Sequence, residues 1–202
     1  MSKLSLDVSR ETMDRLEVYV QLLKKWNPKI NLVSRSTLDD LWERHFVDSA
    51  QLYSLVPSGF CRWVDLGSGG GFPGMVCAII AAEKSPESEF TLIESDARKS
   101  VFLRTVARET GVKATVITDR IERASPAEAD VLSARALADL PTLLEFCARH
   151  LQKTGTALLP KGVNWEKEVQ DARKSWFFGC EPTTSITESG AVILRIGGIS
   201  RV

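Results

Sequence analysis

The feature that most constrains the fold of this chain is a glycine-rich segment, VDLGSGGGFPG, at residues 64–74. It continues the apolar run RWVDL and leads into GMVCAIIAAEK, which has the length and composition of a buried helix. Gly67, Gly69 and Gly71 let the backbone turn tightly and let a ligand approach it closely. Because open α/β sheets bind ligands where a strand ends and a helix begins, the segment predicts a ligand site there.

The sequence after this segment alternates short apolar runs with longer helical patterns. We expect strands at EFTLIES, KATVIT, DVLSARA and TALLPKG, and helices at residues 96–111, 140–151 and 165–178. A hairpin signal around Ser189-Gly190 predicts two more strands within residues 183–197, antiparallel and at or near one edge. The pattern therefore predicts an α/β fold with a doubly wound, seven-stranded, mostly parallel sheet and a C-terminal antiparallel hairpin.

The sequence before the glycine segment predicts helices rather than strands. Apolar residues recur at helical spacing from Met13 to Leu23. Pro28 should end this helix, because proline disfavours helical dihedral angles at the residue before it. A second helical pattern, LDDLWERHFVDSAQLYSLV, ends before another proline. We therefore expect residues 1–58 to form a helical extension packed on a domain of residues 59–202.

Composition limits the classes of partner. The chain of 202 residues carries 26 basic and 26 acidic side chains, so any nucleic-acid role requires a local basic patch. No apolar run approaches the roughly 20 residues of a membrane span, and the N-terminus lacks the apolar core of a signal peptide. The four cysteines form no Cys-x-x-Cys pair and only two histidines accompany them. We expect a cytoplasmic protein with no metal site and no membrane contact.

The glycines can be read in two registers. Gly69, Gly71 and Gly74 satisfy the GxGxxG pattern of dinucleotide-binding proteins, whereas DLGSGGG, beginning at Asp65, satisfies the pattern of methyltransferases that use S-adenosylmethionine. Both folds place an acidic residue after the second strand to bind ribose hydroxyls, and Glu94 occupies that position. The segment alone therefore leaves both ligand classes open.

Three features favour the methyl donor. Asp65 would repel a pyrophosphate but can face an ammonium group or a polarised water. The segment TDRIE follows the third strand, where Asp119 or Glu122 could meet an adenine edge. The terminal hairpin also suits a seven-stranded methyltransferase sheet. In addition, neither tyrosine has a lysine four residues later, so the Tyr-x-x-x-Lys pair of many small dehydrogenases is missing.

Several motifs in a fixed order give the chain a family resemblance. KWNPKINLVS and RHFVDS lie in the helical extension, and DLGSGGGFPG, RIE, SARAL and PKG follow in the domain. In these motifs the chain resembles the bacterial 16S rRNA guanine-N7 methyltransferases, RsmG or GidB, over nearly its whole length. The resemblance implies a class I methyltransferase fold with S-adenosylmethionine as donor. Its implied product is N7-methylguanosine at nucleotide 527 of 16S rRNA, in the usual rRNA numbering.

The expected donor-binding residues lie around the carboxyl ends of the strands: Asp65, Gly67, Gly69, Gly71, Phe72, Glu94, Ile121, Glu122 and Arg135. Asp65 and Glu94 come from the position of these residues in the predicted fold. The resemblance implies the backbone at Phe72, the pair 121–122 and Arg135, and Glu122 is also favoured by its place after the third strand. Members of the family vary before the lysine of PKG, which here is Lys161, preceded by a proline.

The implied reaction needs no acid–base residue, because guanine N7 already carries a lone pair and loses no proton. We therefore expect positioning to provide catalysis, with Lys161 as the candidate residue. His45 is the alternative base. We expect instead that His45 with Ser49, and Arg44 paired with Asp48 at i,i+4, brace the extension against the sheet.

RNA contacts are expected from a small basic set around the donor end of the sheet: Arg35, Arg44, His45, Arg98, Lys99 and Lys161. Arg104 and Arg108 are interleaved with acidic residues and are expected to form a solvated face. The target base should be splayed out to reach a recessed donor pocket. We expect 16S rRNA as partner, within a small-subunit particle, and a monomeric enzyme. Lys161→Ala should weaken RNA methylation more than donor binding.

Three alternatives remain open on the sequence. The chain could methylate another substrate, could be a nicotinamide-dependent oxidoreductase, or could bind a nucleotide without catalysis. Stabilisation by S-adenosylhomocysteine rather than by NAD would separate the methyltransferase hypotheses from the oxidoreductase.

Overall fold

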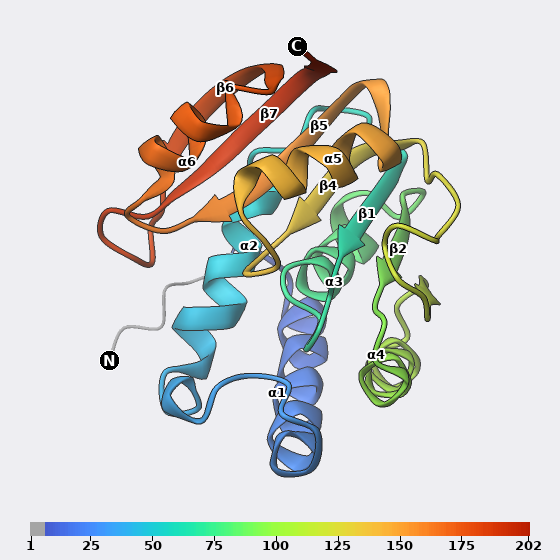
Figure 1. The fold of residues 1–202 in the computed structure, drawn as a ribbon. Coiled ribbons are helices and arrows are strands. Elements are labelled where there is room, and N and C mark those ends of the chain that lie inside the picture. Colours follow the sequence, from blue (N-terminus) through green and yellow to red (C-terminus); the bar gives the residue numbers. More distant parts are fainter. Residues whose placement is uncertain (1–6) are drawn as a thin grey trace.

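Seven strands form one sheet in the order β3-β2-β1-β4-β5-β7-β6 in a computed structural model that describes residues 7–202 (Figure 1). The strands are β1 (Arg62–Leu66), β2 (Glu89–Ile93), β3 (Ala114–Ile117), β4 (Ala129–Ala134), β5 (Leu151–Lys161), β6 (Trp176–Thr184) and β7 (Val192–Arg201). The α-helices are α1 (Arg10–Ile30), α2 (Asp48–Tyr53), α3 (Gly74–Lys84), α4 (Ala97–Thr110), α5 (Leu140–His150) and α6 (Trp165–Ala172).

Strands β1 to β5 pair in parallel, and β7 pairs antiparallel with both β5 and β6. The predicted doubly wound, seven-stranded sheet with a C-terminal antiparallel hairpin is therefore confirmed. The strand order reverses between β1 and β4, which is where open α/β sheets leave a crevice at the strands' carboxyl ends. The glycine segment follows β1 at this crevice.

Helices cover both faces of the sheet (Figure 1). Helices α1 to α4 share one apolar cluster with alternate strand residues such as Trp63 and Leu92. Helices α5 and α6 pack on the opposite face against Val64, Leu66 and Leu132. This alternation along β1 is what a strand buried on both faces requires. Among the described residues, no helix is both long and apolar enough to cross a membrane.

The helical extension differs from its prediction in two places. Helix α1 continues past Pro28 and ends at Ile30, and it is capped by Asn31, whose φ is 50°. A proline in the last turn removes only one backbone hydrogen bond. The Asn27 side chain also accepts bonds from the amides of residues 32–33 at 2.8 and 2.9 Å, which fixes the chain as it leaves the helix.

The second helix predicted in the extension is not continuous. A 3-10 turn, η1 (Arg35–Thr37), precedes a π-helical segment, η2 (Trp42–Val47), which runs directly into the short helix α2. The wider i→i+5 turn of a π-helix shifts side chains from the positions that α-helical spacing predicts. The side chains of η2 therefore find different partners from those expected at i,i+4.

Helix α6 was predicted to extend through residue 178, but it ends at Ala172. Trp176 and Phe178 are buried while Phe177 is 62% exposed, so this stretch follows strand periodicity. The predicted hairpin is thus present with longer strands, and residues 185–191 form its connecting loop.

Candidate active site

The glycine segment is held against the end of β2. Gly67 and Gly69 adopt φ values of 62° and 55°, which glycine reaches without steric cost. The amide of Gly67 donates to the Ile93 carbonyl at 2.9 Å, and the amide of Gly69 donates to Glu94 Oε2 at 2.8 Å. Glu94 therefore connects the segment to β2 and lies at its predicted position beside the glycines.

A pocket of about 430 Å³ opens beside this turn, and we call it the glycine-loop pocket. It brings together residues from the ends of the first three strands and from the turn after β4, among them Gly67, Gly69, Glu94, Lys99, Ile121 and Glu122. Five of these are predicted donor-binding residues. Lys99, predicted to contact RNA, lies in this pocket instead.

Asp65 lies beneath the glycine segment rather than in the wall of the pocket. It is 1% exposed, and the Ser133 hydroxyl donates to its Oδ1 at 2.6 Å. Burial raises the pKa of Asp65 to about 6. A Cβ at Gly74 would collide with the Asp65 side chain, so that glycine is needed for α3 to begin here. The carboxylate thus faces Ser133 and the start of α3.

Helix α1 supports the same segment from below. The Tyr19 hydroxyl donates to the Gly70 carbonyl, and a Cβ at Gly71 would collide with that hydroxyl. The Tyr19 ring stacks on Phe72 with centroids 5.4 Å apart. Gly71 and Phe72 therefore contact the extension, and neither lines the glycine-loop pocket.

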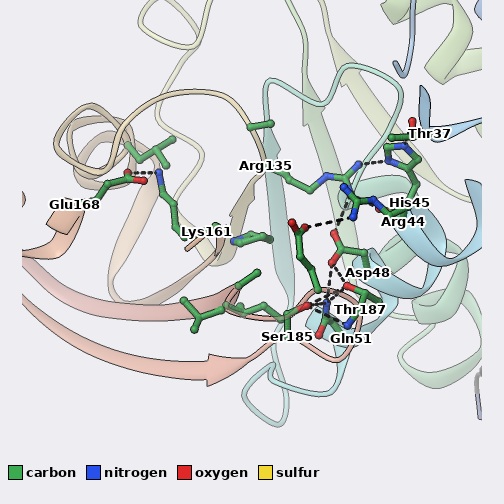
Figure 2. Close-up of a pocket in the computed structure, with 18 of the residues that line it drawn as sticks. Thr37, Arg44, His45, Asp48, Gln51, Arg135, Lys161, Glu168, Ser185 and Thr187 are labelled. Carbon is green, nitrogen blue, oxygen red and sulfur yellow. Dashed lines mark hydrogen bonds and ion pairs between the residues drawn. The ribbon is translucent and has the colours of Figure 1, made fainter. Parts of the chain in front are cut away.

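A second pocket of about 490 Å³ lies between the extension, the turn after β4 and the β6–β7 loop, and we call it the hairpin pocket (Figure 2). It is lined by side chains of both charges, including Arg44, His45, Asp48, Arg135, Lys161 and Glu188. Arg44, His45 and Lys161, predicted to contact RNA, meet here. Arg135, predicted at the donor, also belongs to this pocket.

Arg135 is the central cation of the hairpin pocket (Figure 2). Its guanidinium donates to Asp48 Oδ2 at 2.9 Å and to the Arg44 carbonyl at 3.2 Å. It also lies 5.2 Å from the centroid of the Phe72 ring. These contacts join β4, the extension and the glycine segment at one point.

His45 is neutral and has no free nitrogen. Arg135 can only donate, so Nδ1 of His45 accepts its bond at 2.8 Å, and the Nε2 proton faces the Thr37 hydroxyl at 2.8 Å. Burial and the nearby Arg135 lower the pKa of His45 to about 4. His45 therefore contacts Arg135 and Thr37 rather than Ser49, its expected companion, and this geometry supports a bracing role over a role as general base.

The prediction that Arg44 pairs with Asp48 at i,i+4 is wrong, because these two side chains have other partners among the described residues. Asp48 pairs with Arg135 and also accepts bonds from Gln51 at 2.9 Å and from the Thr187 hydroxyl at 2.6 Å. Arg44 instead faces Glu188 at 3.8 Å. The π-helical geometry of η2 and the long-range contacts with Arg135 and the hairpin loop explain the change.

Lys161 holds the turn between β4 and α5. Its Nζ donates to Glu168 at 2.7 Å and to the Ala138 carbonyl at 3.0 Å, and its side chain is 8% exposed. Glu168 also accepts from the amide of Leu140, the first residue of α5, at 3.0 Å. The Lys161–Glu168 pair therefore fixes both ends of the segment 138–140.

The same turn separates the two pockets. Ala136 and Ala138 line both of them, and Leu137 lines the glycine-loop pocket, where it packs over Gly67. Ala136 adopts a φ of 50°, a conformation that residues with a Cβ rarely adopt. Two ligands, one in each pocket, would thus come together at residues 136–138.

Arg35 and Arg98, the other basic residues predicted to contact RNA, lie outside both pockets. Arg35 is exposed in η1, and Arg98 is exposed and pairs with Asp96 at 3.1 Å. Arg104 donates to the Val116 carbonyl at 2.8 Å, so it is not simply a solvated side chain. Within residues 7–202, no group of three or more His, Cys, Asp or Glu side chains could hold a metal ion.

Sequence reasoning missed the part of the site that comes from the hairpin loop and from α6. Gln51 accepts from the Ile186 amide at 3.0 Å and so joins α2 to that loop. Ser185, Thr187, Glu188 and Glu168 line the hairpin pocket, but they are remote in sequence from the glycine segment. The hairpin signal predicted the loop, yet nothing in the sequence pattern placed it across from η2.

A seven-stranded sheet with a terminal hairpin, a glycine turn after β1 and an acidic residue after β2 defines the class I methyltransferases, whose donor is S-adenosylmethionine. Solved structures agree on the fold. The mitomycin 7-O-methyltransferase MmcR has a TM-score of 0.61 at 12% identity, covering 94% of this chain and 68% of its own. A TehB-like methyltransferase from Corynebacterium glutamicum has a TM-score of 0.55 at 13% identity, covering 92% and 98%.

Sequence comparison gives the family within this class. Residues 12–194 match the GidB family, described as rRNA small subunit methyltransferase G. The protein of that name from Ruegeria sp. (strain TM1040) is 60% identical over 98% of this chain and 97% of its own length. The one from Rhodospirillum centenum is 54% identical, covering 96% and 87%. The chain therefore belongs to the rRNA small subunit methyltransferase G family.

Proposed function

We propose that the chain transfers the methyl group of S-adenosylmethionine to N7 of a guanine in 16S rRNA, at nucleotide 527 in the usual rRNA numbering. Family membership supports the RNA substrate. The observation that carries the chemistry is the meeting of two pockets at residues 136–138, one beside the glycine turn and one lined by both basic and acidic side chains. Donor and acceptor could each occupy one pocket and meet at this turn.

The glycine-loop pocket fits the donor. Gly69 leaves room at the turn, since nothing but the Gly67 carbonyl oxygen at 3.8 Å would meet a Cβ there. In this proposal Gly67 and Gly69 approach the amino-acid tail, and Glu94 accepts hydrogen bonds from the ribose hydroxyls. The adenine lies against Ile121 and Glu122. Asp65 and Gly71 act from below by fixing the shape of the turn. Phe72 does so through its ring contacts with Tyr19 and Arg135, and Arg135 acts from the hairpin pocket.

S-adenosylmethionine supplies a methyl group bound to a sulfonium sulfur. The N7 lone pair forms the new N–C bond, the S–C bond breaks, and its electron pair stays on sulfur. No proton leaves the base, so no general base is required. The occupied nitrogens of His45 are consistent with this chemistry. The chain's contribution is to align the two reactants and to exclude water from them.

The acceptor should reach the hairpin pocket as a base splayed out of its helix. Because the chain has no net charge, we propose that it recognises the shape of folded rRNA rather than its overall charge. We also propose that it acts as a monomer, on a small-subunit particle in the cytoplasm. Of the predicted extension 1–58, residues 1–6 lie outside the described part of the chain, and residues 37–51 complete the proposed acceptor pocket, while residues 59–202 bind the donor. Arg35 and Arg98 remain proposed contacts to phosphate, whereas Lys99 lies in the proposed donor pocket.

Thermal unfolding with S-adenosylhomocysteine, with NAD and with neither tests the donor assignment. We expect S-adenosylhomocysteine at 100 times its Kd to stabilise the protein by about 2.7 kcal/mol and NAD to have no effect. Glu94→Gln should reduce the stabilisation, and Glu181→Gln, a variant of an exposed side chain on β6, should not. Stabilisation by NAD alone would overturn the assignment.

A further inference from the structure

We propose that Arg44 and Glu188 recognise the Watson–Crick edge of the acceptor guanine, and that Glu188 also stabilises the charge that methylation places on this base. The proposal rests on the function proposed above, because it assumes that the hairpin pocket holds a guanine. It adds the residues that select this base and the reason that they do so.

The three carboxylates that line the hairpin pocket differ in their partners. Asp48 accepts bonds from Arg135, Gln51 and Thr187, and Glu168 accepts from Lys161 and from the Leu140 amide. These two carboxylates already accept hydrogen bonds from side chains and amides of the protein itself. Glu188 meets Arg44 at 3.8 Å, which is beyond hydrogen-bond distance, and its side chain is 54% exposed. Glu188 thus keeps its acceptor capacity for a ligand.

The Arg44–Glu188 pair matches the polar groups of guanine. Along its Watson–Crick edge guanine presents the O6 acceptor, the N1–H donor and the N2–H donor. Arg44 offers donors only, and Glu188 beside it offers two acceptor oxygens. Adenine presents an amino donor where guanine has O6 and an acceptor at N1, so the same pair would face unmatched groups. The pair therefore selects guanine.

The position of the pair agrees with the direction of methyl transfer. In a purine, N7 lies on the opposite side of the ring system from N1 and N2. If N7 faces residues 136–138, where the two pockets meet, the Watson–Crick edge faces the remaining wall of the hairpin pocket. Arg44 from η2 and Glu188 from the β6–β7 loop both line that pocket from elements other than this turn.

The charge on Glu188 matters more as the reaction proceeds. Methylation at N7 gives the purine ring a positive charge, and this charge makes N1–H and N2–H stronger donors. Hydrogen bonds from these groups to a carboxylate therefore strengthen between the bound substrate and the transition state. Interactions that strengthen in this way raise kcat as well as kcat/KM. Glu188 is thus both a specificity residue and a catalytic residue in the proposal.

The test compares Glu188→Ala and Glu188→Gln with Glu181→Gln, using 16S rRNA that carries guanine or inosine at the target position. Glu181 is a matched control, since it pairs with Arg195 at 3.4 Å in the same hairpin but lies outside the pocket. We expect Glu188→Ala to lower kcat/KM for guanine by about 10- to 100-fold, partly through kcat. Glu188→Gln should be intermediate, and Glu181→Gln should change it by less than about twofold.

Inosine lacks the 2-amino group but keeps O6 and N1–H, so it isolates one of the predicted bonds. It should be a poorer substrate for the wild-type protein, and the penalty should shrink in Glu188→Ala. If Glu188→Ala behaves like Glu181→Gln, or if the inosine penalty is unchanged, the proposal is wrong. If the wild-type protein transfers no methyl group to guanine, the proposed function itself fails. Stabilisation by S-adenosylhomocysteine in each variant checks that the fold is kept.

Discussion

At the scale of single residues, the polar groups around the two pockets are mostly satisfied by one another. His45 is hydrogen-bonded to Thr37 of the extension and to Arg135. Asp48 is hydrogen-bonded to Arg135 and to Thr187 of the hairpin loop. Lys161 donates its hydrogen bonds to Glu168 and to the turn after β4. We therefore propose that residues whose types suggest catalysis fix positions in this protein, which suits a reaction that moves no proton.

Lys161 provides a test of this interpretation. We expect Lys161→Ala to destabilise the protein by about 1–3 kcal/mol, because it leaves the partly buried Glu168 without its cation. With the Ala138 carbonyl released, methyl transfer to RNA should fall by about 10- to 100-fold. The Kd of S-adenosylhomocysteine should change much less. Steady-state kinetics, calorimetric titration and chemical denaturation measure the three quantities.

The double variant Lys161→Met/Glu168→Gln is the control for stability. It removes both charges, so it should recover most of the lost stability while methyl transfer stays low. An equal loss of donor binding and of methyl transfer in Lys161→Ala would contradict the positioning role.

At the scale of elements, the strands and helices of the sheet were predictable except for most of β6, whose residues 176–178 were predicted as helix, and the irregular parts were not predictable. Burial on both faces of β1, β2 and β4 produces continuous apolar runs, and each helix after them has its own start and stop signals, such as Asp96 and Gly111 on α4. The π-helical turn and the end of α6 depend instead on packing between distant segments. The glycine segment was predicted as a ligand turn, but its support by Tyr19 of α1 was not.

Gly71 tests how the extension and the glycine segment fit together. Gly71→Ala places a methyl group against Tyr19 and forces a non-glycine residue to a φ of 94°. We expect a loss of about 2 kcal/mol or more in unfolding free energy and weaker donor binding. Gly59→Ala also has a positive φ, 75°, but meets open space, so it should cost only about 1 kcal/mol. Equal costs, measured by chemical denaturation, would contradict the contact.

At the scale of the whole molecule, the extension and the sheet share one core and together line the hairpin pocket, where we propose that the acceptor binds. Leu16, Tyr19 and Leu23 of α1 are fully buried in the same cluster as Met75 of α3 and Phe102 of α4. The motif order of the sequence predicted the family and the donor. It could not predict the hairpin pocket, because η2, the turn after β4 and the hairpin loop meet only in the folded chain.

In the proposed function, the two pockets together direct methylation to N7 of one guanine in 16S rRNA. The most direct test of this proposal is to incubate the purified protein with S-adenosylmethionine and small subunits from a strain that lacks this enzyme. The rRNA is then cleaved chemically at N7-methylguanosine and the cleavage is mapped. We predict a single new cleavage, at nucleotide 527, that requires both the protein and the donor. Methylation of another atom or base, or no methylation of 16S rRNA, would contradict the account.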